Sequence, residues 1–149
     1  GHITRPDDAH IVFLPERPYL PQDTLRELMI NHSDGGSEST ARIESAFTAF
    51  GLDSIPNQFG GLDVEQDWGE LLTLEEQSKL AAARALLASP EFVFFDHPGS
   101  SLDPRQLQRI FKTLSTHGIG YICLGRADED TTLYDHVLRI KEDGTWESD

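Results

Sequence analysis

The stretch LLTLEEQSKLAAARALLASPEFVFFDHPGSSLD, residues 71–103, is the most informative about the fold, because it predicts a capped helix, a buried strand and a second helix start in a fixed order. Thr73 and Glu76 form a T-x-x-E capping box, which gives the first helix a defined start. The alanine- and leucine-rich segment after it predicts a helix over about 74–88. The Ser89-Pro90 pair ends that helix, because proline cannot continue it.

A buried strand and a second capped helix follow the first helix. Residues 92–95, FVFF, are four consecutive apolar side chains, typical of a strand buried on both faces of a parallel sheet. Asp103-Pro104 places an N-cap before a proline at the first helical position, and Gln106 completes a second capping box. The apolar face of this helix is formed by Leu107, Ile110, Phe111 and Leu114. Gly118 ends it.

The segments before residue 71 carry weaker signals. Residues 11–14 are an apolar run that predicts a buried strand. Asp23 stands where the N-cap of a short helix belongs, and the apolar stripe of that helix is Leu25, Leu28 and Met29. Residues 31–39 have no periodicity and predict an exposed loop. A further helix carries apolar side chains at Ile43, Ala46, Phe47 and Phe50. Gly51 ends it, and we expect mostly loop over 53–70.

Two strands are predicted near the carboxyl end, over 120–124 and 136–140, with a turn at Asp143-Gly144. The chain therefore alternates strands and helices at lengths typical of an open α/β sheet. No internal repeat interrupts this order.

Composition limits the classes of function. Twelve basic against 26 acidic side chains give a net charge of -14 over 149 residues, which repels nucleic acid and anionic lipid surfaces. The one cysteine, Cys123, lies in an apolar run and is interpreted as a small buried hydrophobe. No apolar run approaches the roughly 20 residues of a membrane-spanning helix. We therefore predict no nucleic-acid partner, and any link to a membrane must come from outside this chain.

The order of these motifs resembles the second half of the ATP-binding cassette, the nucleotide-binding domain of ABC transporters. LTLEEQ, residues 72–77, is similar to the LSGGQ or LSLGEQ signature, residues 92–96 to the Walker B strand, and SSLD, residues 100–103, to the SALD of the D-loop. FLPERPYLP, residues 13–21, resembles the Q-loop region of the peroxisomal fatty-acyl transporter branch and its bacterial relatives. The pair Asp67-Trp68 matches a DW of that branch.

The resemblance covers about residues 11–146 and implies an α/β fold. It predicts a partial P-loop NTPase (RecA-like) parallel sheet together with the α-helical subdomain of an ABC protein. Residues 1–149 would form a single partial ATP-binding domain, with 22–88 as the α-helical subdomain and 1–21 and 89–149 as part of the RecA-like core.

The resemblance also implies roles for particular residues. The signature, which meets the γ-phosphate of ATP held by the opposite subunit, falls on Thr73, Leu74, Glu75 and Glu76. Asp96 falls on the Walker B aspartate, which holds magnesium through water. The D-loop, which makes contacts between subunits, falls on Ser101 and Asp103.

Four positions depart from the family pattern, each at a place that touches the γ-phosphate or the attacking water. Glu16 replaces the Q-loop glutamine, His97 replaces the general-base glutamate, and Arg126 replaces the switch histidine. Glu75 stands on the second signature glycine and brings a negative charge towards an anion, which would repel it by roughly 3 kcal/mol at ~5 Å. Two simpler interpretations remain open: Glu75 is a first-turn acid that stabilises its helix, and His97 is a solvated turn residue.

No G-x-x-x-x-G-K-[ST] motif occurs in the chain, so the loop that holds the β- and γ-phosphates is not part of it. We expect either that the chain begins in the middle of a cassette or that the natural protein lost its first half. Mg-ATP is the cofactor implied for the parent domain, and no tightly bound cofactor is expected for this chain.

The function implied is the ATP-binding cassette portion of an ABC transporter, coupling ATP binding and hydrolysis to membrane transport, with this isolated chain inactive. The alternative is a degenerate, non-catalytic cassette that acts as a regulatory or docking module. The implied partners are a second nucleotide-binding domain in a head-to-tail dimer and the transmembrane domain of the transporter. The implied location is the cytoplasmic face of a membrane, reached through a transmembrane domain outside this chain.

Overall fold

Three parallel strands form the central sheet in the order β1 (Ile11–Leu14), β4 (Phe92–Asp96) and β5 (Gly120–Leu124). The computed structural model describes residues 2, 4, 9–30, 39–126 and 130–149. In the register of the sheet, Phe13 lies beside Phe94 and Phe94 beside Ile122. The parallel α/β sheet predicted from the strand–helix alternation is confirmed.

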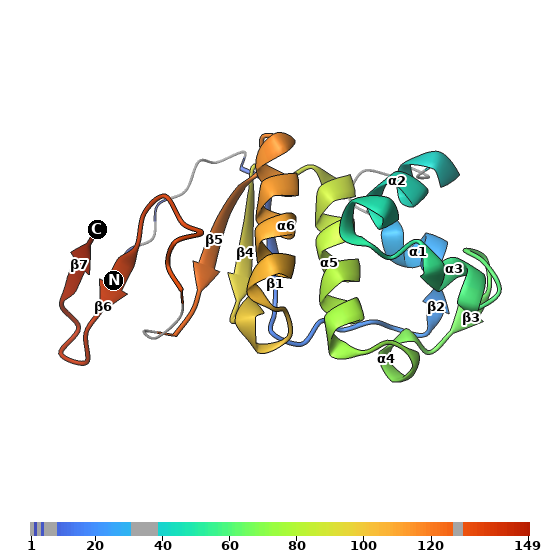
Figure 1. The fold of residues 1–149 in the computed structure, drawn as a ribbon, viewed down its shortest axis with the longest axis horizontal. Helices are drawn as coiled ribbons and strands as arrows, with labels where there is room; N and C mark the ends of the chain where they lie inside the picture. The colour runs from blue at the N-terminus through green and yellow to red at the C-terminus, as the bar shows by residue number, and fades with distance from the viewer. Residues whose placement is uncertain (1, 3, 5–8, 31–38, 127–129) are drawn as a thin grey trace.

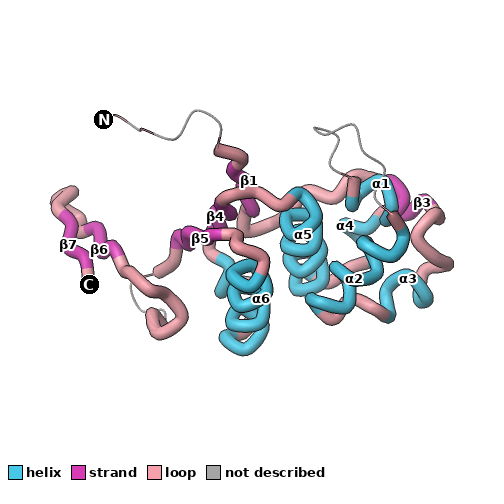
Figure 2. Tube along the Cα trace, turned by 90° about the horizontal axis from the view of Figure 1, so that it is seen from above, coloured by secondary structure: helices cyan, strands magenta, loops and turns pink. Residues whose placement is uncertain are grey.

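Two helices cover one face of this sheet. They are α5 (Leu74–Ala88) and α6 (Pro104–Thr116), and Figure 2 shows both on the same side of the three strands. Val93 and Phe95 of β4 point to that side and are buried. The ring of Phe111 on α6 stacks on Tyr121 of β5 with centroids 4.3 Å apart, which fixes the helix over the strand.

The opposite face of the sheet is open within the described part of the chain. Phe13, Ile122 and Leu124 are 57%, 43% and 49% exposed, and Phe92 is 40% exposed. The prediction that residues 92–95 are buried on both faces was therefore wrong: alternate side chains of a strand point to opposite faces, and described helices cover one of them. Cys123 is partly buried rather than fully buried.

A group of short elements lies on the other side of α5 from the sheet (Figure 1). In chain order they are β2 (Asp23–Thr24), α1 (Leu25–Met29), α2 (Thr40–Phe50), α3 (Ser54–Gln58), β3 (Glu65–Gln66) and α4 (Trp68–Leu71). Trp68 is fully buried among them, and its Nε1–H donates to the carbonyl oxygen of Asp23 at 2.8 Å. The edge of its ring meets Phe59 at a centroid distance of 5.6 Å.

Two predictions for this region need correction. Asp23 is not the N-cap of α1: Thr24 is, since its side chain accepts the Glu27 N–H, while Asp23 pairs with Gln66 in the β2–β3 ladder. The segment 53–70 is not mostly loop, because α3, β3 and α4 form there. The predicted loop over 31–39 falls on residues 31–38, outside the described residues, and on Ser39, the N-cap of α2.

The two predicted capping boxes are both present. Thr73 accepts the Glu76 N–H while Glu76 accepts the Thr73 N–H, and Asp103 and Gln106 make the same reciprocal pair at α6. The predicted stripe of α2 is buried, and Gly51 ends that helix in the left-handed conformation with φ 71°. A short 3-10 turn, Pro98–Ser100, joins β4 to α6.

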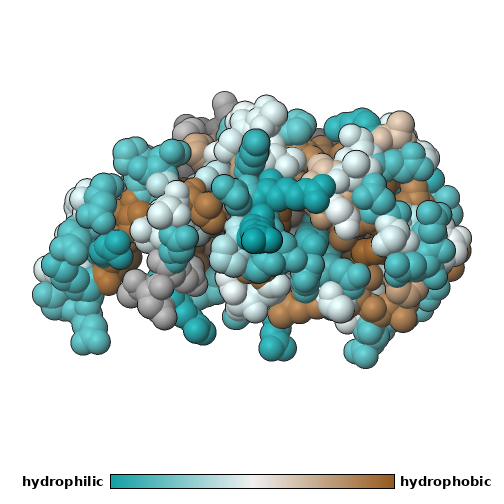
Figure 3. Space-filling model, viewed as in Figure 1, coloured by the Kyte–Doolittle hydropathy of each residue, from teal (hydrophilic) through white to brown (hydrophobic). Residues whose placement is uncertain are grey.

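The chain ends in a separate hairpin. β6 (Leu138–Ile140) pairs antiparallel with β7 (Trp146–Ser148), and the turn at Asp143-Gly144 is confirmed. The strand predicted over 136–140 is thus shorter and does not join the parallel sheet. The hairpin lies at the left end of Figure 1, with hydrophobic patches over it in Figure 3, whereas the surface over α6 is largely hydrophilic. The described helices include none that is long and apolar enough to cross a membrane.

Candidate functional site

Asp96 and His97 mark the carboxyl end of β4. Asp96 lies beside Leu124 of β5, and the His97 N–H donates to the Leu124 carbonyl oxygen at 2.8 Å, so the strand pairing fixes both residues. The backbone of His97 is left-handed, with φ 47°, where the chain leaves the sheet. Their side chains remain accessible, at 34% and 41% exposure. The Asp96 carboxylate therefore stands at the rim of the sheet, where parallel α/β folds bind ligands.

The His97 ring is held against its neighbour. Nδ1 of His97 lies 2.7 Å from Oδ1 of Asp96, and because a carboxylate only accepts, Nδ1 carries the proton. Nε2 is then the ring nitrogen of neutral His97 that can accept a proton from water. The pairing thus leaves His97 chemically able to act as a base through one atom, although its reach differs from that of a glutamate.

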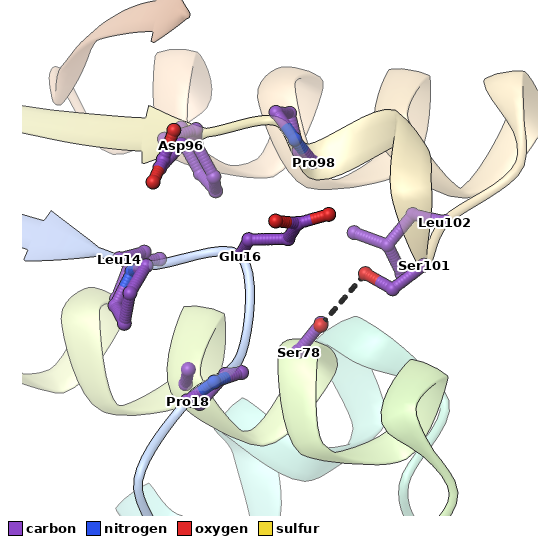
Figure 4. A pocket seen from close by; sticks show the side chains of 11 residues that line it. Leu14, Glu16, Pro18, Ser78, Asp96, Pro98, Ser101 and Leu102 are labelled. Carbon is purple, nitrogen blue, oxygen red and sulfur yellow. Dashed lines mark hydrogen bonds between the residues drawn. The ribbon is translucent and has the colours of Figure 1, made fainter.

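A small cavity beside Asp96 brings three of the predicted residues together. It lies between the loop after β1, helix α5 and the turn after β4, and its lining includes Glu16, Asp96 and Ser101 (Figure 4). Glu16 extends from its loop towards the turn that carries Ser101. The cavity volume is about 20 Å³, room for about one water molecule. It can hold a bridging water but not a nucleotide.

A hydrogen bond that the sequence reasoning missed ties α5 to this turn. The hydroxyl oxygens of Ser78 and Ser101 lie 2.8 Å apart, and both line the same cavity (Figure 4). Ser78 lies on α5, four residues after Leu74, so the turn after β4 is fixed to that helix. No local spacing in the sequence indicates a contact between positions 23 residues apart.

The capping box at the start of α5 satisfies the N–H groups of Thr73 and Glu76. Both the N–H and the hydroxyl of Thr73 donate to Oε2 of Glu76, at 2.8 and 2.9 Å, and the Glu76 N–H donates back to the Thr73 hydroxyl. Leu74 is partly buried beside them. A phosphate approaching this helix start would have to compete with the Glu76 carboxylate, so the observed arrangement is better suited to capping than to anion binding.

Glu75 is turned towards a positive charge. Lys79 forms an ion pair with it at i,i+4, and Gln106 at the start of α6 also bonds to it; these contacts, Lys79 first, lower the pKa of Glu75. Lys79 therefore offsets part of the repulsion expected between Glu75 and a phosphate. This ion pair could have been predicted from the sequence, because glutamate and lysine four residues apart on a helix lie side by side.

Arg126 lies apart from the small cavity. It follows β5 by two residues, is exposed, and is not among the residues that line the cavity, although its strand neighbours Asp96 through Leu124. Asp103 likewise serves α6 as its cap, accepting the Gln106 N–H at 2.9 Å. The structure thus groups Glu16, Asp96 and Ser101, and leaves Thr73–Glu76 and Arg126 outside that group.

Asp96 fits a water-mediated contact with magnesium, because it offers one accessible carboxylate and a neighbouring water-sized cavity. Among the described residues there is no cluster of three or more His, Cys, Asp or Glu that could hold a metal ion directly. The residues present therefore fit part of a Mg-ATP site, on the magnesium side, and not a complete one.

Comparisons with known proteins bear on these assignments. No family model matches the chain. It is 29% identical over 147 residues to an ABC transporter ATP-binding protein of Synechocystis, covering 99% of this chain and 22% of that protein. It is 31% identical over 136 residues to one of Haemophilus influenzae, covering 89% and 22%, and 28% identical to the mouse lysosomal cobalamin transporter ABCD4, covering 92% and 24%. The chain thus spans less than a quarter of the length of these relatives.

A solved structure agrees in fold. A bacterial Atm1-family ABC exporter with ATP bound superposes with a TM-score of 0.64 at 24% identity, over 87% of this chain and 23% of that one. Over nearly its whole length, the chain is homologous to the ATP-binding proteins of ABC transporters, subfamily D members among them, and its α/β fold is that of part of their nucleotide-binding domain.

Proposed function

We propose that this chain is the ATP-binding cassette portion of an ABC transporter, which couples ATP binding and hydrolysis to transport across a membrane. The observation that carries the proposal is the position of Asp96: its carboxylate ends the central strand β4 beside Glu16 and the turn that leads to Ser101, in the order of the cassette motifs. Mg-ATP is the cofactor of the parent domain. When bound, magnesium would neutralise phosphate charge, and Asp96 would hold it through water.

The proposal includes two protein partners. One is a second nucleotide-binding domain paired head to tail, which the D-loop residues Ser101 and Asp103 would face. The other is a transmembrane domain at the cytoplasmic face of a membrane. The loop after β1 would make that contact, and it presents Tyr19, 81% exposed, whose ring is apolar and whose hydroxyl can hydrogen-bond. Residues 22–88 would then act as the α-helical subdomain, and 1–21 and 89–149 as the RecA-like part.

We further propose that the isolated 149-residue chain is inactive. It carries no phosphate-binding G-x-x-x-x-G-K-[ST] loop, and the helix start that should meet a phosphate is engaged by Glu76. Titration calorimetry tests both the ATP-binding role of the full-length protein and the inactivity of the isolated chain. The full-length protein should bind Mg-ATP with a micromolar constant, and the chain alone should bind no tighter than millimolar. Micromolar binding by the chain alone would contradict its inactivity, and no binding by the full-length protein would contradict the transporter assignment.

A degenerate, non-catalytic cassette is the second candidate, favoured by the departures at Glu16, Glu75, His97 and Arg126. The cassette would then regulate or dock rather than hydrolyse. In the full-length protein, His97→Glu with Arg126→His should raise the ATPase rate only when Glu75→Gly is added. A wild-type rate of about 1 per second or faster, ordinary for enzymes, would rule this candidate out.

A further inference from the structure

A second hollow, larger than the small cavity, lies away from Asp96, between β1, the end of α1 and α5. Its volume is about 370 Å³, within the range of pockets that hold small ligands. It exists because Ala81, Ala85 and Ala88 present small side chains along α5, opposite Val12 and Leu14 of β1. It shares Leu14 and Ala81 with the small cavity beside Asp96 but neither Asp96 nor Glu16.

Arg84 is the one charged side chain in the apolar wall of this hollow. It is partly buried on α5, and burial lowers the pKa of its guanidinium, which nevertheless stays charged at neutral pH. Among the described residues it has no hydrogen-bond or ion-pair acceptor, in contrast to Arg26, Arg109 and Arg139, which bond to oxygen atoms. A charge that has lost part of its water and gained no partner is costly, and an anion that enters the hollow would offset that cost.

The lining of the pocket favours a carboxylate over a phosphate. Its remaining wall is mostly aliphatic, with Met29 and Ile30 at the α1 end, and His10 is the other residue of the lining with a polar side chain. A doubly charged phosphate would need more donors than these two. A carboxylate matches the planar guanidinium fork with two parallel hydrogen bonds, and an apolar body would replace water along the alanines.

We propose that the hollow between β1, α1 and α5 is a binding site for a small amphipathic carboxylate, with Arg84 holding the carboxylate and the alanine face of α5 holding an alkyl or aryl body. The site contains neither Asp96 nor Glu16, so binding to it can be measured without ATP. Because α5 begins at the signature residues, a ligand in the pocket would contact the same helix.

Octanoate titrated into the 149-residue chain, below its micelle concentration and without nucleotide, tests the proposal by calorimetry and by thermal shift. Saturable one-to-one binding is expected, with no comparable binding of octanol or octylamine. Arg84→Gln should weaken octanoate by about 10- to 100-fold, the cost of losing a charge-assisted bond. Arg105→Gln, at an exposed arginine of α6, should leave it unchanged.

If Arg84→Gln does not fold, a second variant, Ala88→Leu, tests the same proposal. Ala88→Leu fills the pocket from a partly exposed position and keeps the charge, and it should also abolish binding. The proposal is overturned if octanoate does not bind, if octylamine binds equally, or if neither folded variant weakens octanoate. Binding of an acidic peptide but not octanoate would assign the pocket to a protein partner, which also overturns it.

Discussion

Replacing Trp68 with phenylalanine should destabilise the fold by about 2–4 kcal/mol. The indole is fully buried, and its N–H donates to the Asp23 carbonyl oxygen at 2.8 Å. Phenylalanine leaves that partly buried carbonyl without its donor, which costs about 1–3 kcal/mol. It also leaves a void of roughly 40 Å³ beside Phe59, which costs about 1 kcal/mol more. The expected loss in Tm is roughly 5–15 °C.

The chain provides its own control, since its other tryptophan, Trp146, is 66% exposed on the terminal hairpin. Urea unfolding followed by circular dichroism should show Trp146→Phe within about 0.5 kcal/mol of wild type. In that variant the remaining fluorescence comes from Trp68 alone and should be blue-shifted in the folded state. If Trp68→Phe costs no more than Trp146→Phe, the tryptophan does not hold β2 and α4 against α5, and the reasoning fails.

Two further predictions concern charge and exposed surface. Because contacts lower the pKa of Glu75 in the folded state, its pair with Lys79 adds stability above the unfolded value of 4.5 and loses it as the pH falls through the folded pKa. Urea unfolding should therefore show Glu75→Gln about 0.5 kcal/mol less stable than wild type at pH 7 and equal to it in acid. The open sheet face should drive self-association, so Ile122→Ser should lower the mass measured by light scattering. Leu71→Ser, at the same 43% exposure but on α4, should not; a wild type that is monomeric at high concentration contradicts this.

Local signals predicted the elements that are stabilised locally. Both capping boxes, the stripe of α2 and the strand–helix alternation depend on side chains within a few residues of one another, and the structure has them. The segment 53–70 could not be predicted in this way. Its short elements have little intrinsic stability and depend on Trp68 reaching Asp23, 45 residues away in sequence.

The candidate site shows the same division. The position of Asp96 followed from its strand, and the structure places it at the rim with Glu16 and Ser101. The contact between Ser78 and Ser101 could not be predicted from the sequence, because it joins segments that are distant along the chain. Whether helices cover one face of the sheet or both depends on the whole fold. Four consecutive apolar residues in a strand therefore could not predict that the described helices cover only one face.

The proposed magnesium role of Asp96 is tested by the dependence of ATP binding on magnesium, measured in the full-length protein with and without Asp96→Asn. If Asp96 holds magnesium through water, magnesium should tighten ATP binding to the wild type, and the Asp96→Asn variant should lose most of that effect while remaining as stable to heat. Equal tightening by magnesium in both proteins, or no ATP binding by the wild type, would contradict the assignment of this chain to an ATP-binding cassette.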